Sequence, residues 1–400
     1  MKLRRVATKE GAVDRKGRTR SEEEEGKHRQ TLAGRLSAAF AFLFLPSGYP
    51  ASVTSDYAGY QLFDTLQAFC SAITGLLATQ SLLRGMGVGD ATATAASAIV
   101  QWVTRDGIGR ITTISFASAM SGKLDAYAKQ WRYMADILND GGMLLEIVAP
   151  ISPTLFMPLS CLGSVLKSIT GVAGGSTKAA LTQHFAVEGN LADVAAKDNS
   201  QETAVSLLGT IVGTWICGYV EGNNTLQISF FALFTLLHLW TNWKGIRCLR
   251  LNTLNRYRLL LLWDAFVSDK RLLNAEEVAG KEAIVFVDAR LRQRWSKIEL
   301  GVTLAGKEEE ENASRVAAAR SEKERGRKSI VMQSSTGRKV VLLDRCTAED
   351  VIEGFCYALA EEEGENEQTV HAFVSALQAS TWRTDRHLLE AGRDRYSVDE

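Results

Sequence analysis

Eighteen consecutive uncharged residues, Leu226–Trp243, read LQISFFALFTLLHLWTNW. A helix needs about 20 apolar residues to cross the hydrocarbon core of a bilayer, so the length of this segment is close to that of a membrane span. Trp240 and Trp243 lie at its end, and Lys244 and Arg247 follow them. Tryptophan beside a positively charged loop is typical of the interface between lipid and water. These features favour a membrane-spanning helix at this place.

Further stretches without a charge precede this one and have comparable lengths, at residues 36–55, 65–83, 147–166 and 203–220. The last contains Gly209-x-x-x-Gly213, a spacing of small residues that lets two helices approach closely in lipid. Gly, Ser and Thr interrupt most of these stretches, and the mean hydropathy of the whole chain is −0.05. A soluble helical protein whose core helices are apolar on all sides therefore stays open as the alternative.

Charged residues are distributed unevenly along the 400-residue chain, although 46 Lys and Arg balance 46 Asp and Glu. Residues 31–245 carry 11 basic and 13 acidic groups, or 24 in 215 residues, whereas residues 246–400 carry 25 and 27, or 52 in 155. The first density, about 11%, is less than half of the ~25% typical of globular proteins. We expect a boundary near residues 245–250, with a water-facing domain after it.

The periodicity of apolar residues predicts helices in the charge-poor part and a mixture afterwards. Leu251–Val267 reads as an amphipathic helix with Arg256 and Arg258 on its polar side. We expect strands at Ala283–Val287 and Arg338–Asp344, and helices at Thr347–Glu361 and Gln368–Gln378. The predicted fold class is mainly α: a charge-poor, membrane-associated helical bundle with a small C-terminal α/β domain.

The predicted domain organisation has five parts. They are a disordered polar N-terminus (1–35), a helical core (36–262), a connecting helical and strand segment (263–305), a charged linker (306–337) and the small C-terminal α/β domain (338–400).

Composition argues against several classes of protein. A zero net charge disfavours a nucleic-acid binder, which usually has a basic excess. The six cysteines lie far apart, without a Cys-x-x-Cys pair, which disfavours a disulfide scaffold and a clustered zinc site. No nucleophile elbow, catalytic triad signature or dinucleotide-binding fingerprint is present, so an enzyme is not favoured.

One helix in the charge-poor part carries an unusual polar stripe. Arg132, Asp136 and Asp140 follow one another at spacings of four residues, and Lys129 precedes Arg132 by three. In a region with few charges such a stripe must face water, a partner charge or a polar cavity. A solvated face is the plainer interpretation, and a pathway or binding cavity inside a bundle is the functional one. His238, with Asn242 one turn later, is expected to be buried and hydrogen-bonded, or else part of a proton relay.

Two more segments could bind ligands. Gly171-Val-Ala-Gly-Gly-Ser-Thr-Lys178 reads as a glycine-rich loop before a helix that begins at Lys178, where backbone N–H groups could hold a phosphate. A plain packing turn is the alternative reading. The candidate phosphate-binding residues are Gly174, Gly175, Ser176, Thr177 and Lys178. His184 and Glu188 have the spacing of two metal ligands on one helical face, but a transition-metal site needs more, so no metal is expected.

Several motifs together resemble the Root UVB-sensitive (RUS) family, whose shared domain is also called the vitamin B6 photo-protection and homoeostasis domain. The resemblance runs in order from about residue 40 to 262, and residues 382–390 look like the family's smaller C-terminal domain. The motifs are Phe44-Leu-Pro-Ser-Gly-Tyr-Pro-Ala-Ser-Val53, Asp56-Tyr57, Trp102-x-x-x-Asp106-Gly107, Lys129-x-Trp131-Arg132-x-x-x-Asp136, Asn139-Asp140, Gly171-Val-Ala-Gly-Gly-Ser-Thr, His184-Phe-Ala, Gly189-Asn190-x-x-Asp193, Ala196-Lys197-Asp198-x-Ser200-Gln201-Glu202 and Leu254-Asn255.

The resemblance implies a role in vitamin B6 homeostasis or in UV-B and developmental signalling, without an established reaction. It implies a membrane or organelle location (plastid, mitochondrion or endoplasmic reticulum) and another RUS-family protein as a partner. The acidic residues of the N-terminus are atypical of a plastid transit peptide. Positions that match the family pattern form the candidate polar cavity, with no role carried over: Lys129, Arg132, Asp136, Asp140, His184, Asn190, Asp193 and Lys197.

Two hypotheses follow. In the first, a membrane-associated bundle binds or transports a small anionic metabolite, and a vitamin B6 phosphate such as pyridoxal phosphate would fit the glycine-rich loop; no other cofactor is expected. In the second, a soluble helical interaction module regulates a partner through its charge-dense C-terminal part.

Overall fold

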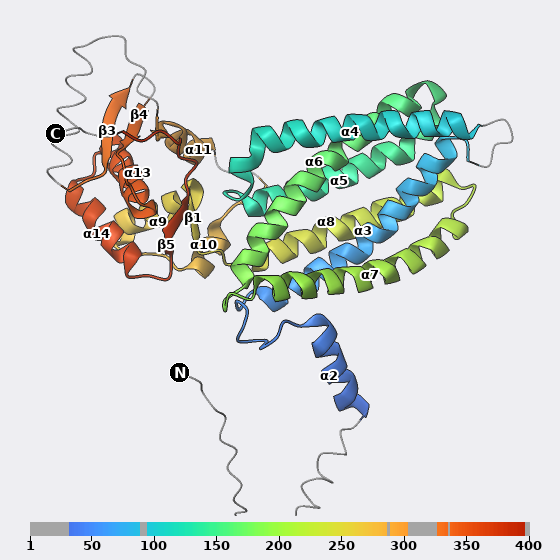
Figure 1. The fold of residues 1–400 in the computed structure, drawn as a ribbon, viewed down its shortest axis with the longest axis horizontal. Coiled ribbons are helices and arrows are strands. Elements are labelled where there is room, and N and C mark those ends of the chain that lie inside the picture. The colour runs from blue at the N-terminus through green and yellow to red at the C-terminus, as the bar shows by residue number, and fades with distance from the viewer. Residues whose placement is uncertain (1–31, 89–93, 286–288, 303–325, 335–336, 397–400) are drawn as a thin grey trace, which may run out of the picture.

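The structure is a computed structural model that describes residues 32–88, 94–285, 289–302, 326–334 and 337–396. It has two parts placed end to end: a bundle of long helices, and a smaller module of short helices and strands (Figure 1). The predicted class, mainly helical with small sheets toward the C-terminus, is confirmed. Residues 1–31 of the expected disordered N-terminus (1–35) lie outside the described residues, whereas its residues 32–35 are helical rather than disordered.

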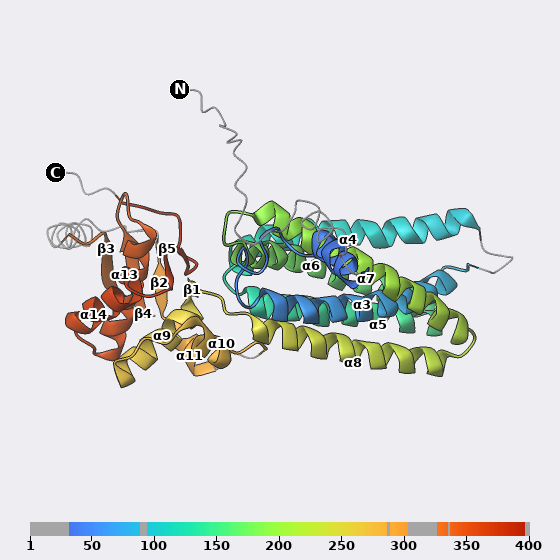
Figure 2. The same cartoon turned by 90° about the horizontal axis from the view of Figure 1, so that it is seen from below.

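Six of the helices that the structure describes make up the bundle, and α3 lies at its centre. It packs against α5, α7 and α8, while α6 packs against α4 and α5 (Figure 2). The loops after α4, α6 and α8 lie at the end that faces the C-terminal module. The helices are α3 (Tyr57–Gly85), α4 (Ala95–Leu124), α5 (Ala128–Val148), α6 (Pro153–Phe185), α7 (Leu191–Tyr219) and α8 (Asn224–Cys248).

Close approaches between these helices occur at glycines. A Cβ atom added to Gly163 of α6 would lie 2.9 Å from the carbonyl oxygen of Gly142 in α5, and the reverse distance is also 2.9 Å. On α7, a Cβ atom added to Gly209 would lie 2.8 Å from the Cβ of Ala72, and one added to Gly213 would lie 2.8 Å from a methyl group of α3. The Gly209-x-x-x-Gly213 spacing therefore marks a helix crossing, as predicted.

Two of the described helices, α3 and α6, are long and apolar enough to cross a membrane by length and composition. The segment Leu226–Trp243 lies within α8, which is not one of the two. Length and composition alone are weak evidence, because the core helices of soluble proteins pass the same test.

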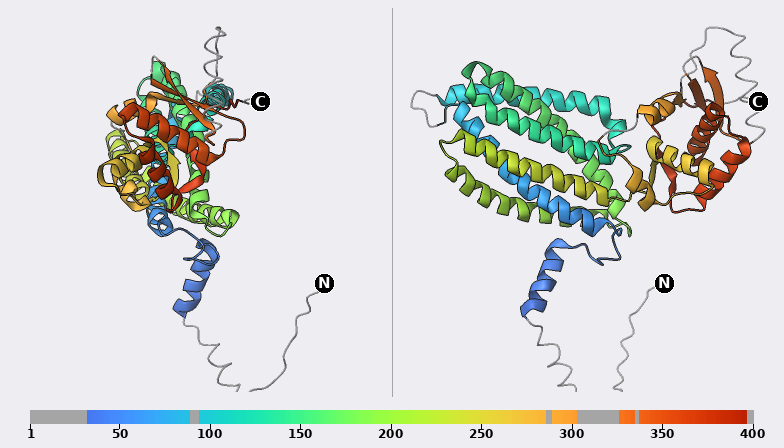
Figure 3. Two further views of the ribbon diagram at one scale, coloured as in Figure 1. Left: turned by 90° about the vertical axis from the view of Figure 1, so that its left-hand side faces the viewer. Right: turned by 180° about the vertical axis from the view of Figure 1, so that it is seen from behind.

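A separate helix, α2 (Leu32–Phe44), lies outside the bundle beside α7 (Figure 3). Side chains of α7 hold the end of this helix. The Gln201 amide donates a 2.5 Å hydrogen bond to the carbonyl oxygen of Phe44, and Lys197 donates one to the carbonyl oxygen of Phe42.

The C-terminal module has a three-stranded sheet of order β2-β4-β3 and a parallel pair of β1 with β5. A continuous apolar core includes Trp263, Phe355 and Phe373, each fully buried. Its elements are β1 (Thr253–Asn255), α9 (Arg256–Asp269), α10 (Ala275–Lys281), α11 (Ala289–Ser296), β2 (Ile298–Leu300), β3 (Ser329–Ser334), β4 (Gly337–Leu342), α13 (Ala348–Glu363), α14 (Glu367–Gln378) and β5 (Arg383–Leu388).

Three elements of this module were predicted. The expected strand Arg338–Asp344 corresponds to β4, and the helix Gln368–Gln378 to α14. The expected helix Thr347–Glu361 corresponds to α13. Thr347 caps it by accepting the N–H of Asp350, whose carboxylate accepts the N–H of Thr347 in return.

Other expectations for this part are wrong. The described portion of Ala283–Val287 forms a bend rather than a strand, and residues 286–287 lie outside the described residues. The helix expected from Leu251 begins at Arg256 instead, because Thr253–Asn255 pairs with β5. Residues 329–334 of the expected linker form β3, while its residues 306–325 lie outside the described part.

Arg256 and Arg258 do not lie on a polar, exposed side of α9. Arg256 is 9% exposed and Arg258 is 1% exposed. The reason is that α9 is packed inside the C-terminal module, with its first turn on the side of the bundle. Hydrogen bonds compensate the burial of the Arg256 guanidinium, which donates to the carbonyl oxygens of Leu389, Trp295 and Ile298.

Candidate functional site

The polar stripe of α5 lies inside the bundle. Arg132 donates a 2.9 Å hydrogen bond to Asp64 of α3, and the hydroxyl group of Tyr60 donates to the same oxygen at 3.1 Å. Asp136 and Asp140 are 8% and 4% exposed. The structure thus rejects a solvated face and places these charges where only partners on neighbouring helices can compensate them.

Asp136 and Asp140 have different partners. One oxygen of Asp136 accepts hydrogen bonds from the amides of Gln67 in α3 and Asn242 in α8, the latter at 2.5 Å. One oxygen of Asp140 lies 2.8 Å from Nδ1 of His238, as expected for a buried, hydrogen-bonded histidine. The other oxygen, Oδ1 of Asp140, is buried and has no hydrogen-bond partner among the described residues. It is therefore a free acceptor in the interior.

These contacts form three groups that follow one another along the bundle: Tyr60 and Arg132 with Asp64, Gln67 and Asn242 with Asp136, and His238 with Asp140. We call the three groups together the polar ladder. Toward the far end of the bundle, a separate buried contact joins the amide of Gln227 in α8 to Ser81 of α3 at 2.8 Å. Along α3 the distance from Tyr60 to Ser81 is about 31 Å at ~1.5 Å per residue, close to the ~30 Å thickness of a bilayer core. The ladder consists of Tyr60, Asp64, Gln67, Arg132, Asp136, Asp140, His238 and Asn242.

A second buried charge lies between α4, α5 and α6. Glu146 is 1% exposed and pairs with Arg105 of α4 and, at 3.1 Å, with Lys167 of α6. Two cations thus face one carboxylate at the far end of the bundle. The cluster links three helices, and within the described part of the chain it has no hydrogen bond or ion pair to the polar ladder.

The outer surface of the bundle is apolar over large areas. Leucine, isoleucine, valine and tryptophan side chains are exposed along four helices, whereas the interior holds the charges of the polar ladder beside apolar clusters such as that around Ile73 and Leu77. Examples are Ile99, Val100, Val103, Ile111 and Ile114 of α4, Leu155 and Leu162 of α6, Leu207, Leu208, Ile211 and Trp215 of α7, and Leu233, Leu236, Leu237 and Trp240 of α8.

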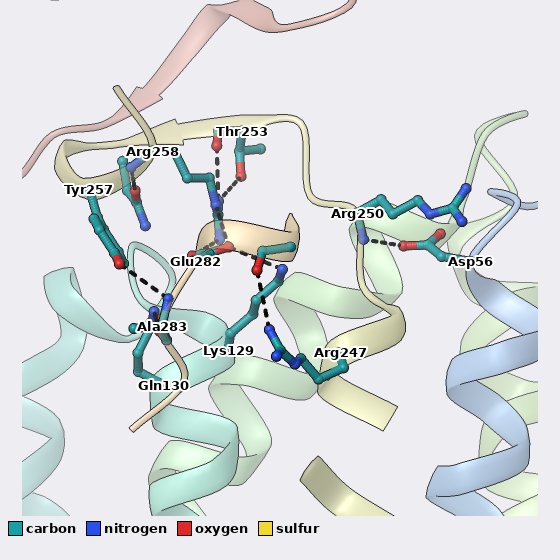
Figure 4. A network of polar contacts seen from close by, with 12 residues as sticks. Asp56, Lys129, Gln130, Arg247, Arg250, Thr253, Tyr257, Arg258, Glu282 and Ala283 are labelled. Atoms are coloured by element: carbon teal, nitrogen blue, oxygen red, sulfur yellow. Dashed lines mark hydrogen bonds and ion pairs between the residues drawn. The ribbon is translucent and has the colours of Figure 1, made fainter. Parts of the chain in front are cut away.

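The two parts of the protein are joined by buried charges (Figure 4). Glu282 accepts from Lys129 of α5 at 3.0 Å and from the Arg258 guanidinium at 3.0 and 3.2 Å. All three side chains are 2% exposed or less. Burial by itself would raise the pKa of Glu282, but Arg258 and Lys129 lower it from 4.5 to about 2. We call these three residues the joint triad.

Asp56, at the start of α3, holds the same end of the bundle. Its Oδ2 atom lies 2.9 Å from Nε2 of His184. The same atom accepts the backbone N–H of Arg250 at 2.7 Å (Figure 4). Burial opposes ionisation of Asp56, but the hydrogen bond and charge of His184 lower its pKa from 3.8 to about 2. This carboxylate therefore connects α3, α6 and the segment that leads into the C-terminal module.

The candidate cavity residues do not converge on one place. Arg132, Asp136 and Asp140 belong to the polar ladder, Lys129 to the joint triad, and His184 to the Asp56 site. The remaining three hold the chain between α2 and α3: Asn190 donates to the carbonyl oxygen of Ser52 at 3.1 Å, Asp193 accepts the N–H of Ser47 at 2.6 Å, and Lys197 binds the carbonyl oxygen of Phe42.

The expectation of a glycine-rich loop at residues 171–177 is also wrong. Residues 171–177 lie within α6, which continues from Pro153 to Phe185. N–H groups inside a helix bond to carbonyl groups one turn back, so this segment offers no helix N-terminus to a phosphate. Lys178 instead pairs with Asp198 at 2.8 Å and Glu202 at 2.5 Å. The structure therefore offers no helix N-terminus for a phosphate at the candidate residues Gly174, Gly175, Ser176, Thr177 and Lys178.

Sequence reasoning missed the partners of the stripe. Asp64 and Gln67 lie three residues apart on α3, a helix whose other residues are almost entirely uncharged. A polar pair in such an apolar helix indicates a buried polar contact and could have been recognised in the sequence. Glu282 and Arg258 carried no such signal, because they lie among the many charges of the C-terminal part.

The arrangement defines a class of protein: a helical bundle with an apolar exterior and a buried ladder of titratable groups, closed at one end by a small α/β module. A family model described as "Vitamin B6 photo-protection and homoeostasis domain" matches residues 30–270. The chain belongs to this family, as the sequence motifs indicated.

Curated relatives agree with this assignment. The chain is 50% identical over 248 residues to "RUS family member 1" of Dictyostelium discoideum, covering 61% of this chain and 47% of that protein. It is 41% identical over 269 residues to "Protein root UVB sensitive 3" of Arabidopsis thaliana, covering 66% and 61%. With "Protein root UVB sensitive 2, chloroplastic" of the same plant, identity is 28% over 375 residues, covering 88% and 84%. The chain thus spans about half to three fifths of the length of the first two. No solved structure matches.

Proposed function

We propose that the bundle spans a membrane and that its polar ladder moves protons, as the driving part of a transport activity in vitamin B6 homeostasis. The observation that carries the proposal is the placement of charge: carboxylates are buried inside the bundle while apolar side chains cover much of its outer surface. Buried ionisable groups are costly, and within membranes they mark ion paths and proton relays.

Aromatic residues at the two ends of the bundle support this orientation. Near the C-terminal module, Lys244 lies 5.9 Å from the ring of Trp240 and 5.5 Å from that of Trp243. At the far end, Trp215 and Tyr219 of α7 are 85% and 73% exposed. Aromatic belts at two levels are typical of membrane proteins.

The chemistry of the ladder suits protons better than a larger solute. His238 and Asp140 can exchange a proton across 2.8 Å, and Oδ1 of Asp140 is free to accept another. Within the ladder, the cavity that Tyr60, Asp64 and Arg132 help to line has a volume of about 10 Å³, which is no more than one water needs.

We expect Asp140→Asn to reduce proton flux by roughly tenfold or more, because general acid–base groups contribute ~10²–10⁴ to proton transfer. The amide keeps the size of the side chain but cannot take up a proton. The purified full chain is reconstituted in liposomes with an internal pH dye, and flux is driven by a potassium diffusion potential.

Asp106→Asn is the matched control, because Asp106 is an exposed carboxylate of α4 outside the ladder. It should conduct like the wild type. Flux equal to that of protein-free liposomes, or equal flux in the Asp140→Asn variant and the wild type, would contradict the proposal.

A second function is favoured by one observation. Arg110 and Asp106 form an exposed ion pair halfway along α4, with side chains 78% and 48% exposed, and such a pair is unfavourable against lipid. In a soluble interaction module, a partner protein would cover the apolar exterior and the ion pair of Arg110 with Asp106 could face water. Membrane extraction separates the two functions.

A further inference from the structure

A cavity of about 350 Å³ lies where the first turns of α5 meet the C-terminal module. Its volume falls in the range of small-molecule sites, ~300–1,000 Å³. It is separate from the polar ladder, and none of its lining residues belongs to the joint triad. Neither the proposed proton path nor the family description assigns it a ligand.

Aromatic rings form its walls. Tyr127 and Trp131 come from the start of α5, and Trp295 comes from α11. The rings of Tyr127 and Trp295 lie 6.4 Å apart with a tilt of 31°, and Phe116 holds Trp131 by an edge contact at 5.7 Å. Such walls suit a flat ring, because aromatic groups attract one another by stacked and edge contacts.

The polar groups of the cavity are few and differ in charge. The amide nitrogen of Gln130 donates to the carbonyl oxygen of Ala283 at 2.8 Å, which leaves its buried Oε1 without a partner among the described residues. Glu390 accepts a 3.3 Å hydrogen bond from the hydroxyl group of Tyr127. These two acceptors suit a ligand with a hydrogen-bond donor.

Arg292 of α11 supplies the opposite charge. It is exposed, lines the same cavity and has no ion-pair partner in the described part of the chain. A guanidinium without a carboxylate partner is suited to an anionic group such as a phosphate or carboxylate. The cavity thus combines a ring site, two acceptors and a cation that has no carboxylate partner in the described part of the chain.

We propose that this cavity binds a flat aromatic or heteroaromatic small molecule that carries a hydrogen-bond donor and one anionic group. The ring lies against Tyr127, Trp131 and Trp295. Its donor faces Oε1 of Gln130, and its anionic group pairs with Arg292. Because the walls come from both α5 and α11, the ligand contacts both parts of the protein. The proposal does not depend on proton movement through the bundle.

Calorimetric titration of the purified full chain tests the proposal with three probes: pyridoxine 5′-phosphate, pyridoxine and inorganic phosphate. Pyridoxine 5′-phosphate has the ring, the donor and the anion, and it lacks the aldehyde that would react with lysines. We expect it to bind saturably with one site per chain. Pyridoxine should bind about tenfold more weakly, and inorganic phosphate should not compete at equal concentration.

Arg292→Gln should remove the difference between pyridoxine 5′-phosphate and pyridoxine. Arg290→Gln, the same change on the same helix but outside the cavity lining, should keep it. Gln130→Leu should weaken both ring probes. The proposal is overturned if pyridoxine 5′-phosphate gives no saturable binding, if Arg292→Gln binds it like the wild type, or if inorganic phosphate competes equally well.

Discussion

Glu282→Gln is expected to lower the free energy of unfolding by about 3–5 kcal/mol, because it leaves two buried cations without their common partner. Lys129 and Arg258 are 2% and 1% exposed and can neither reach water nor find another carboxylate in the joint triad. Denaturant titration of the full chain in detergent, followed by tryptophan fluorescence, measures the loss.

Glu276→Gln is the matched control. Glu276 pairs with Arg250 at 2.9 Å, but its side chain is 67% exposed, so the loss should stay below about 1 kcal/mol. If Glu282→Gln does not fold, the double variant Lys129→Met with Glu282→Gln should restore folding in part, since it removes one of the two unpaired cations. Equal losses of unfolding free energy in the Glu282→Gln and Glu276→Gln variants would contradict the stabilising role of the joint triad.

The joint triad also predicts a direction of pH dependence. The pKa of Glu282 is about 2 in the folded chain against 4.5 as its usual value. Its contribution is therefore complete above pH 4.5 and is lost as the pH falls toward 2. The Glu282→Gln variant should lack this part of the acid sensitivity.

Gly163→Leu is expected to destabilise the bundle by about 3 kcal/mol, at the upper end of typical overpacking costs. A Cβ atom alone would lie 2.9 Å from the backbone oxygen of Gly142, and a backbone atom cannot move aside as a side chain can. The crossing of α5 and α6 must therefore open, which also displaces Glu146 from Lys167. The same denaturant titration measures the change.

Gly175→Leu in the same helix provides the control. No atom lies within 4 Å of a Cβ placed there, and leucine favours a helix over glycine by up to ~1 kcal/mol. This variant should be as stable as the wild type or slightly more so. Similar destabilisation by both variants would show that the Gly142–Gly163 crossing is not specifically tight.

Part of the fold follows from local patterns. The uncharged run around His238 and the spacing of Arg132, Asp136 and Asp140 indicated helices with a polar stripe, since helical periodicity is a local property. The cap at Thr347 likewise needs only neighbouring residues. The glycine-rich segment was misread because glycine disfavours helices by only ~1 kcal/mol, and the packing of α6 against α4 and α5 outweighs this.

The candidate site could be predicted only in part. The stripe on α5 is visible in sequence, but its partners lie 68–106 residues away along the chain, at Asp64, Gln67, His238 and Asn242. Pairings at such separations are set by the tertiary arrangement. For the same reason, the sequence does not show that Asn190 and Lys197 lie apart from the stripe, where they bind backbone carbonyl groups before α3.

Alkaline carbonate extraction of membranes from cells that express the full chain tests the central claim most directly. If the apolar exterior of α4, α6, α7 and α8 faces lipid, the protein stays in the membrane pellet while a peripheral marker protein is released. Release of the protein into the supernatant together with that marker would contradict a membrane-spanning bundle and favour the soluble interaction module.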